Sequence, residues 1–198
     1  MCTMIVGIDL AGSEKRNTGF CVMNLKLECK TKILYSNEEI IQEVEKVKPK
    51  VISIDAPLFL PLGRKSLKNR KGPHLRECDR KLLEMKIKFF PLTLGPMRKL
   101  TERGILLRKI FEKKGYKVVE TYPGAAQDIL KIPRKNSGIE KVRRSLKKLG
   151  IKGDVDKKNI SADELDAIVC AYVGFLYLKK KFLALGNRKE GFMILPLP

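Results

Sequence analysis

The chain has 198 residues, of which 42 are Lys or Arg and 22 are Asp or Glu, so its formal net charge at pH 7 is +20. This length predicts a single domain over residues 1–198, and a content of 43% hydrophobic and 32% charged residues argues against a membrane protein. The apolar runs are too short for a spanning helix, and the start MCTMIVGIDL lacks signal-peptide features, so we expect a cytoplasmic protein. Five cysteines without C-x-x-C spacing, and one histidine, favour buried thiols over disulfides or zinc.

The first third of the chain predicts an antiparallel meander followed by a helix and a parallel strand. Three short apolar runs separated by brief turns form the meander: residues 4–10, 19–25 and 30–36. Ser36 or Asn37 then caps a helix that ends before Pro49. The continuous apolar run 51–55 is typical of a central parallel strand that is covered on both faces.

A long segment that follows this strand, at about residues 56–73, is basic and rich in Pro and Gly, which prevents regular structure. It leaves the carboxyl end of a strand, which is where ligands bind in open α/β sheets. Two interpretations stay open. The segment either covers a small substrate as a lid or grips a nucleic-acid backbone through five cations: Arg64, Lys65, Lys68, Arg70 and Lys71.

The rest of the chain predicts alternating helices and one buried strand. Helices are expected at about 74–86, 98–114, 124–131 and 138–149, and a strand at 117–121. Ser161 and Glu164 form a capping box that starts a helix running through residue 181. The ending GFMILPLP is expected to form an edge strand, because Pro196 and Pro198 cannot donate to a central ladder. The sum is a mixed sheet with helices on its faces.

Carboxylates recur in apolar segments, where an unpaired charge costs several kcal/mol. Asp9 and Asp55 each end an apolar strand, and because these strands are expected to be neighbours, the two acids should emerge at the same edge. Asp163 and Asp166 are three apart on a helix, so both could reach one ion. Turn formation by the strand acids and helix-dipole pairing by the helix acids are the competing explanations.

Two further acids, Glu120 and Asp79, each have a structural interpretation beside a functional one. Glu120 in KVVET is either a site residue or the partner of a nearby Lys or Arg, and Asp79 in RECDR is most simply a helix-surface ion pair with Arg76 or Arg80.

Four carboxylates without His or Cys suit Mg²⁺, or Mn²⁺, because two such ions about 4 Å apart stabilise the attacking and leaving oxygens of a phosphoryl displacement. Basic clusters at 63–72, 143–148 and 179–181 add a second indication. Any one cluster is equally explained as a solvated face, but together they favour a polyanionic partner, nucleic acid first.

A family resemblance rests on the motifs GIDLAG, SIDAPL, RECDR, ETYP and DELDAIVCAY, in this order over nearly the whole chain. They resemble an uncharacterised family of predicted RNase H-like nucleases, and the diacidic last helix is similar to that of Holliday-junction resolvases. The resemblance implies an RNase H-like α/β fold, a mixed sheet with an antiparallel three-strand meander plus parallel strands and helices on both faces. It also implies Asp9 as the ligand shared by two metals and Asp55, Asp163 and Asp166 as further ligands. Glu120 matches a strand position where the resolvase acid is not always catalytic.

The leading hypothesis is therefore a metal-dependent nuclease that hydrolyses phosphodiester bonds of DNA or RNA by a two-metal mechanism. The first alternative is a non-catalytic nucleic-acid-binding protein with the same fold. A phosphotransferase or ATPase of the actin-like group is less favoured, because a second Gly-rich phosphate loop is missing. Resolvase-like enzymes act as dimers, and the apolar ending FMILPLP could support a homodimer.

Overall fold

The computed structural model describes residues 3–69 and 71–198. Within these residues the strands are β1 (Met4–Asp9), β2 (Thr18–Asn24), β3 (Glu28–Leu34), β4 (Val51–Asp55), β5 (Val118–Thr121), β6 (Lys152–Gly153), β7 (Phe182–Asn187) and β8 (Gly191–Pro196). The helices are α1 (Asn37–Val47), α2 (Glu77–Glu84), α3 (Gly95–Lys113), α4 (Pro123–Ile129), α5 (Ile139–Lys148) and α6 (Ala162–Leu178), with short 3₁₀ turns at Lys135–Ser137 and Asp154–Asp156.

The strands form one mixed sheet in the order β6-β3-β2-β1-β4-β5-β8-β7. β1, β2 and β3 pair antiparallel as a meander, and β1, β4, β5 and β8 run parallel beside it. The outermost strand β7 returns antiparallel to β8. This confirms the expected combination of a three-strand meander with parallel strands.

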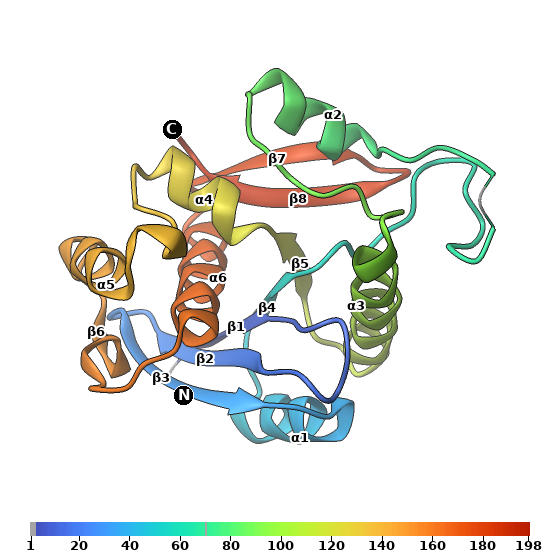
Figure 1. The fold of residues 1–198 in the computed structure, drawn as a ribbon. Helices are drawn as coiled ribbons and strands as arrows, with labels where there is room; N and C mark the ends of the chain where they lie inside the picture. The colour runs from blue at the N-terminus through green and yellow to red at the C-terminus, as the bar shows by residue number, and fades with distance from the viewer. Residues whose placement is uncertain (1–2, 70) are drawn as a thin grey trace.

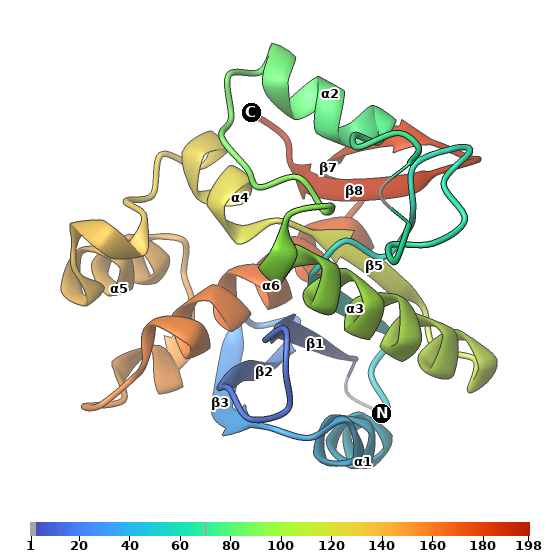
Figure 2. The same ribbon diagram turned by 45° about the vertical axis from the view of Figure 1, so that its right-hand side comes forward.

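Helices cover both faces of the sheet (Figures 1 and 2). On one face α6 packs across β1, β2 and β4, and its approach is so close that a Cβ built on Gly7 of β1 would lie 2.2 Å from the carbonyl oxygen of Ala167. On the other face, side chains of α1 and α3 bury a second apolar cluster with Ile8 and Ile54. The carboxyl ends of β1 and β4 thus emerge between two helical layers.

The helix caps expected from sequence are present. Ser36 and Glu39 form a capping box at the start of α1, and Ser161 and Glu164 form one at the start of α6. The cap at Ser161 fixes where α6 begins relative to the sheet, which matters for the acids in its first two turns.

The end of the chain differs from the prediction in two ways. α6 ends at Leu178 instead of continuing through residue 181, and residues 182–187 form β7. β7 takes the outer position, so the edge-strand assignment of the ending was wrong: β8 lies between β5 and β7. Proline does not prevent this, because Pro196 is the last residue of β8 and Pro198 lies beyond it.

Two expectations from composition can also be compared with the structure. In the described part of the chain, none of the helices has the length and apolar character needed to span a membrane. Cys21, Cys29, Cys78 and Cys170 are free and buried, as the spacing of the cysteines predicted.

Candidate active site

Asp9 and Asp55 are the last residues of β1 and β4 and are direct register partners in the parallel pair. Neighbouring strands lie about 4.8 Å apart, and residues paired in this way point to the same face of the sheet. Gly7 and Asp9 are two residues apart, so this face is the one that α6 covers. The structure therefore brings the two half-buried carboxylates together at one edge, as expected.

α6 begins directly above this edge. Gly19 of β2 is the register partner of Asp9, and a Cβ built on it would lie 2.0 Å from the carbonyl oxygen of Asp163. Asp166 lies one turn further along α6, where it is buried and accepts a hydrogen bond from Nε2 of Gln127 at 3.3 Å. The first two turns of α6 thus place Asp163 and Asp166 on the same side of the sheet as the strand acids.

Cys170, one turn beyond Asp166, reports how close three of these acids are. Burial raises the pKa of this thiol, and the negative charges of Asp55, Asp9 and Asp166 raise it further. The thiol also contacts the backbone of Asp55. Cys170 therefore stays protonated beneath the acids and is not a nucleophile in this environment.

Glu120 does not join this group. Its register partner on β4 is Ile54 and not Asp55, so its side chain points to the opposite face of the sheet. There its Oε2 accepts hydrogen bonds from Nη1 of Arg76 at 2.8 Å and from the backbone N–H of Leu58 at 2.7 Å. Burial raises the pKa of Glu120, and Arg76 opposes this shift. Of the two interpretations of Glu120, this position matches the second, in which it forms an ion pair with a nearby arginine.

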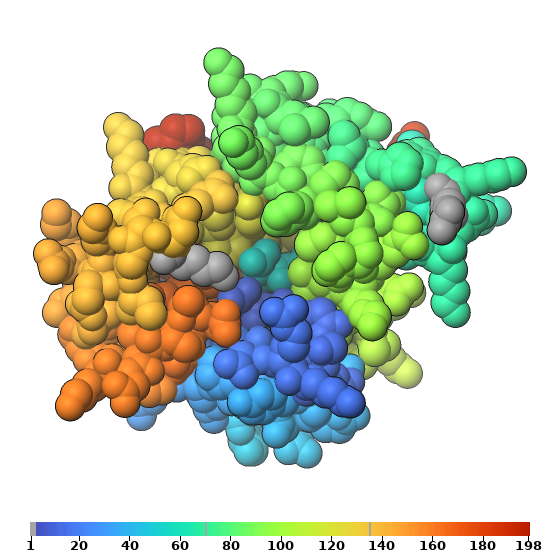
Figure 3. All heavy atoms as spheres, viewed as in Figure 1, coloured from blue at the N-terminus to red at the C-terminus, as the bar shows by residue number. Residues whose placement is uncertain are grey.

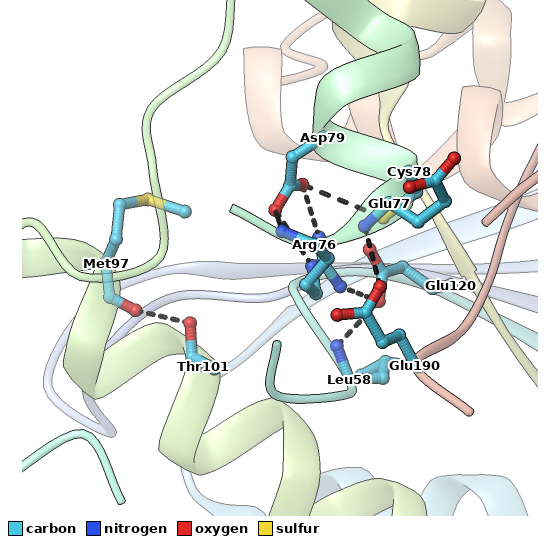
Figure 4. Close-up of polar contacts among 9 residues, drawn as sticks. All are labelled: Leu58, Arg76, Glu77, Cys78, Asp79, Met97, Thr101, Glu120 and Glu190. Carbon is cyan, nitrogen blue, oxygen red and sulfur yellow. Dashed lines mark hydrogen bonds and ion pairs between the residues drawn. The ribbon is translucent and has the colours of Figure 1, made fainter. Parts of the chain in front are cut away.

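Arg76 and Asp79 complete this ion network (Figure 4). Nη2 of Arg76 donates to Oδ1 of Asp79 at 2.9 Å, and Nε donates to Oδ2 at 3.1 Å. The pairing was expected from the R-x-x-D spacing, but the surface location was wrong, because both side chains are almost completely buried. The two side chains are buried because α2 packs against β7 and the start of α2 faces β5, where Arg76 meets Glu120.

The described residues of the predicted irregular segment, 56–69 and 71–73, are irregular, but the irregular stretch continues to residue 76, so α2 begins three residues later than expected. This stretch projects beside the turn between β7 and β8, away from α6 (Figures 1 and 2). Glu190 of that turn anchors it by accepting hydrogen bonds from the backbone N–H groups of Leu62 and Glu77. This location gives no support to the lid interpretation.

The five basic residues expected to bind nucleic acid have different positions in this segment. Arg64 is buried, and its guanidinium donates to the carbonyl oxygens of Ser66, Asn69, Gly72 and Pro73, so it holds the segment together instead of facing outward. Lys65, Lys68 and Lys71 are exposed. Arg70 lies outside the described residues. A run of basic letters does not distinguish an internal arginine from a surface lysine, so the sequence alone does not separate Arg64 from the exposed lysines.

Two cavities meet at the acidic edge. Asp9 and Asp163 line one of about 540 Å³, together with Arg16 from the β1–β2 loop. Asp55 lines a second of about 260 Å³, and Met97 and Leu100 of α3 line both. In Figure 3 this edge is a hollow where blue atoms of the β1 region and teal atoms after β4 lie between α3, α4 and α6. Sequence reasoning missed the second cavity, because its walls come from segments far apart in the chain.

The chemistry of the donors can be compared with that of a hard divalent cation. In the part of the chain that the structure describes, no three His, Cys, Asp or Glu side chains form a ready metal cluster. Mg²⁺ keeps several waters and is commonly bound by one or two carboxylates plus substrate phosphates. The register pair of Asp9 and Asp55 supplies two carboxylates on one face, so the oxygen donors fit such an ion.

Comparison with known proteins identifies the family and the fold. A family model described as a protein of unknown function, DUF429, matches residues 7–179, and the chain belongs to this family. No curated protein matches its sequence.

Two solved structures are similar over the whole chain. Thermus thermophilus RuvC in complex with a Holliday junction substrate is 11% identical, with a TM-score of 0.55, and covers 98% of this chain and 100% of its own. A second structure of Thermus thermophilus RuvC is 10% identical, with a TM-score of 0.49 and the same coverage. The likeness to the first shows that the fold is the RNase H-like one of RuvC.

Proposed function

We propose that this member of the DUF429 family is a divalent-metal-dependent nuclease that hydrolyses phosphodiester bonds of DNA or RNA. The observation that carries the proposal is the register pair Asp9–Asp55, which faces the acids of α6 at one open edge of an RNase H-like sheet. An acidic edge in a chain of net charge +20 is unusual, and a cation between the acids and a polyanion reconciles the two.

Each acid has a distinct part in this proposal. Asp9 and Asp55 hold the cation, and Asp163 and Asp166 approach it from α6 as further ligands or through water. One or two Mg²⁺ or Mn²⁺ ions bound there would activate a water and stabilise the charge on the leaving oxygen, which is the two-metal form of this chemistry. The hydrogen bond from Gln127 holds the carboxylate of Asp166 in place. Glu120 faces the other side of the sheet, so in this proposal it does not bind the cation and instead pairs with Arg76.

Cations beside the acidic edge would bind the phosphates of the substrate. Arg16 lines the cavity of Asp9, and Lys99 lines an adjoining cavity with it. Exposed Lys65, Lys68 and Lys71 extend the basic surface along the irregular segment. The RuvC structure that resembles this chain was solved with a Holliday junction, which supports nucleic acid as the substrate class. A single domain, a homodimer and a cytoplasmic location remain parts of the proposal.

A non-catalytic nucleic-acid-binding protein is the second candidate. It is favoured by one observation, the net charge of +20, because Lys and Arg side chains bind nucleic-acid phosphates without a metal. In that case affinity should fall with salt at a slope of about 0.9 per phosphate contacted, and metal should have little effect.

The test is cleavage of a labelled panel of single-stranded, duplex and four-way-junction DNA, RNA and RNA/DNA hybrid, with Mg²⁺, Mn²⁺ or EDTA. Asp9→Asn removes the proposed shared ligand, and Asp156→Asn, an exposed partner of Lys147, is the matched control. We expect metal-dependent cleavage that is lost in Asp9→Asn and retained in the control. Cleavage by Asp9→Asn at the wild-type rate contradicts the proposal, and binding without cleavage by any protein favours the second candidate.

A further inference from the structure

The cavity beside Asp55 has the composition of a binding pocket for a flat, mostly apolar group. Its walls include aromatic and aliphatic side chains: Phe89, Phe90, Leu92, Met97, Tyr122 and Met193. Phe90 is 72% exposed, which is unusual for a phenylalanine and places an aromatic ring in solvent at this pocket. An exposed aromatic ring beside an apolar pocket with few polar groups is typical of a site that stacks a ligand.

The polar end of the same cavity is formed by the Arg76 ion network. Arg76, Asp79 and Glu120 all line it. The hydrogen bonds that Glu120 accepts from Leu58 and Arg76 both go to its Oε2. Among the described residues Oε1 of Glu120 is one of few buried polar side-chain atoms without a hydrogen-bond partner. A buried acceptor without a donor is unfavourable, so this oxygen indicates a ligand that donates an N–H.

Figure 4 shows how the pocket is arranged around this network. Met97 of α3 extends toward the Arg76 and Asp79 side chains from one side, and Glu120 lies on the other side of Arg76. Because Met97 also lines the cavity of Asp9, the pocket opens next to the Asp9–Asp55 pair. A group bound in the pocket would therefore be a close neighbour of a phosphate held at that pair.

We propose that this pocket receives one unstacked nucleobase of the substrate and that Oε1 of Glu120 selects bases carrying an exocyclic amino group. The inference rests on the proposed function, since it takes the bound polymer to be nucleic acid. Phe90 and Tyr122 stack on the base, and the carboxylate oxygen accepts the amino N–H. Enzymes that read an extruded base use the same two elements, stacking by apolar side chains and hydrogen bonds to the base edge.

The substitution Glu120→Gln replaces the hydrogen-bond acceptor Oε1 by a donor. In Glu120→Gln the amide oxygen can still accept from Leu58 and Arg76, which leaves the NH₂ group in place of Oε1. A base with a carbonyl oxygen at its edge would then be preferred over one with an amino group. Phe90→Ala removes the stacking ring, and Phe192→Ala, which truncates a partly exposed phenylalanine outside this pocket, is its matched control.

The experiment measures binding of labelled dC, dA and dT decamers in EDTA, so that cleavage plays no part. The wild type should bind dC and dA more tightly than dT by about fivefold or more, and Glu120→Gln should reverse or abolish this ranking. Phe90→Ala should weaken all three by about fivefold or more, and Phe192→Ala should not. An identical base ranking in wild type and Glu120→Gln overturns the selection by Glu120. Unchanged affinity in Phe90→Ala overturns the pocket.

A second measurement locates the base. With ¹³C-methyl methionine, dCMP should shift the methyl signals of Met97 and Met193, which line the pocket, and leave that of Met23 in β2 unchanged. Absence of shifts at both Met97 and Met193 at saturating dCMP contradicts the assignment. Failure of the proposed nuclease looks different: the base ranking and the methyl shifts would persist while no substrate of the panel is cut.

Discussion

Arg76→Ala tests whether the buried ion network holds the irregular segment and α2 on the sheet. The side chains of Arg76, Asp79 and Glu120 are 3%, 4% and 1% exposed, so the substitution leaves two carboxylates buried without their cation. Removing one partner of a buried pair costs about 3–5 kcal/mol. At an m-value of about 2 kcal/mol/M, the urea midpoint should fall by about 2 M.

The pH dependence of this loss has a definite sign. A carboxylate buried without a cation has a raised pKa in the folded state, so its destabilising effect is absent below the unfolded-state pKa of about 4, grows as pH rises above that value and is complete above the folded-state pKa. Arg76→Ala should therefore cost less at pH 5 than at pH 8, as measured by urea unfolding at both. Arg80→Ala is the control, because Arg80 is half exposed and 3.7 Å from Glu77, a pair of about 0–1 kcal/mol. A loss below about 1 kcal/mol for Arg76→Ala, equal at both pH values, refutes the reasoning.

Three further substitutions test how the rest of the site is held. Arg103 donates to the carbonyl oxygens of Ala11 and Ser13 in the β1–β2 loop, so Arg103→Ala should cost about 2–3 kcal/mol in urea unfolding, and Arg103→Lys should not restore it. Gly19→Ala puts a methyl against the backbone of α6 and should lower the unfolding free energy by about 3 kcal/mol. An unfolding free energy within about 0.5 kcal/mol of the wild type, which is about the error of the measurement, would contradict the close packing. Burial raises the pKa of Glu164, but Lys157 and other hydrogen-bond donors lower it overall. The loss of unfolding free energy in Glu164→Gln should therefore be full at pH 7 and decline as pH falls below about 4.3, the pKa of glutamate in the unfolded chain. A loss that does not depend on pH would contradict this.

Local sequence signals were sufficient for most of the framework. Apolar runs of strand length, the capping boxes and the prolines act over a few residues, and these located β1 to β5 and the starts of α1 and α6. The meeting of Asp9 and Asp55 also followed from local signals, because both acids end strands that pair in parallel.

The remaining features depend on packing between distant segments. Glu120 faces away from the acidic edge because its register partner is Ile54, and a shift of one residue would have reversed this. No element was predicted for residues 182–187, which form β7, because this strand follows α6 after only a short turn and is defined by its pairing with β8. The pocket beside Asp55 combines residues from α2, α3, β4, β5 and β8, a combination that only the folded chain reveals.

The central claim is that the Asp9–Asp55 pair binds the cation on which cleavage depends. The most direct measurement is the cleavage rate of Asp55→Cys and Asp55→Ala in Mg²⁺ and in Mn²⁺ or Cd²⁺, on the substrate that the panel identifies. A thiolate is a poor ligand for Mg²⁺ and a better one for softer ions. We expect both variants to lose about 100-fold or more in Mg²⁺, and Asp55→Cys alone to regain activity in the softer ions. Equal rates of Asp55→Cys and Asp55→Ala in every metal, or wild-type rates in Mg²⁺, would contradict metal binding by Asp55.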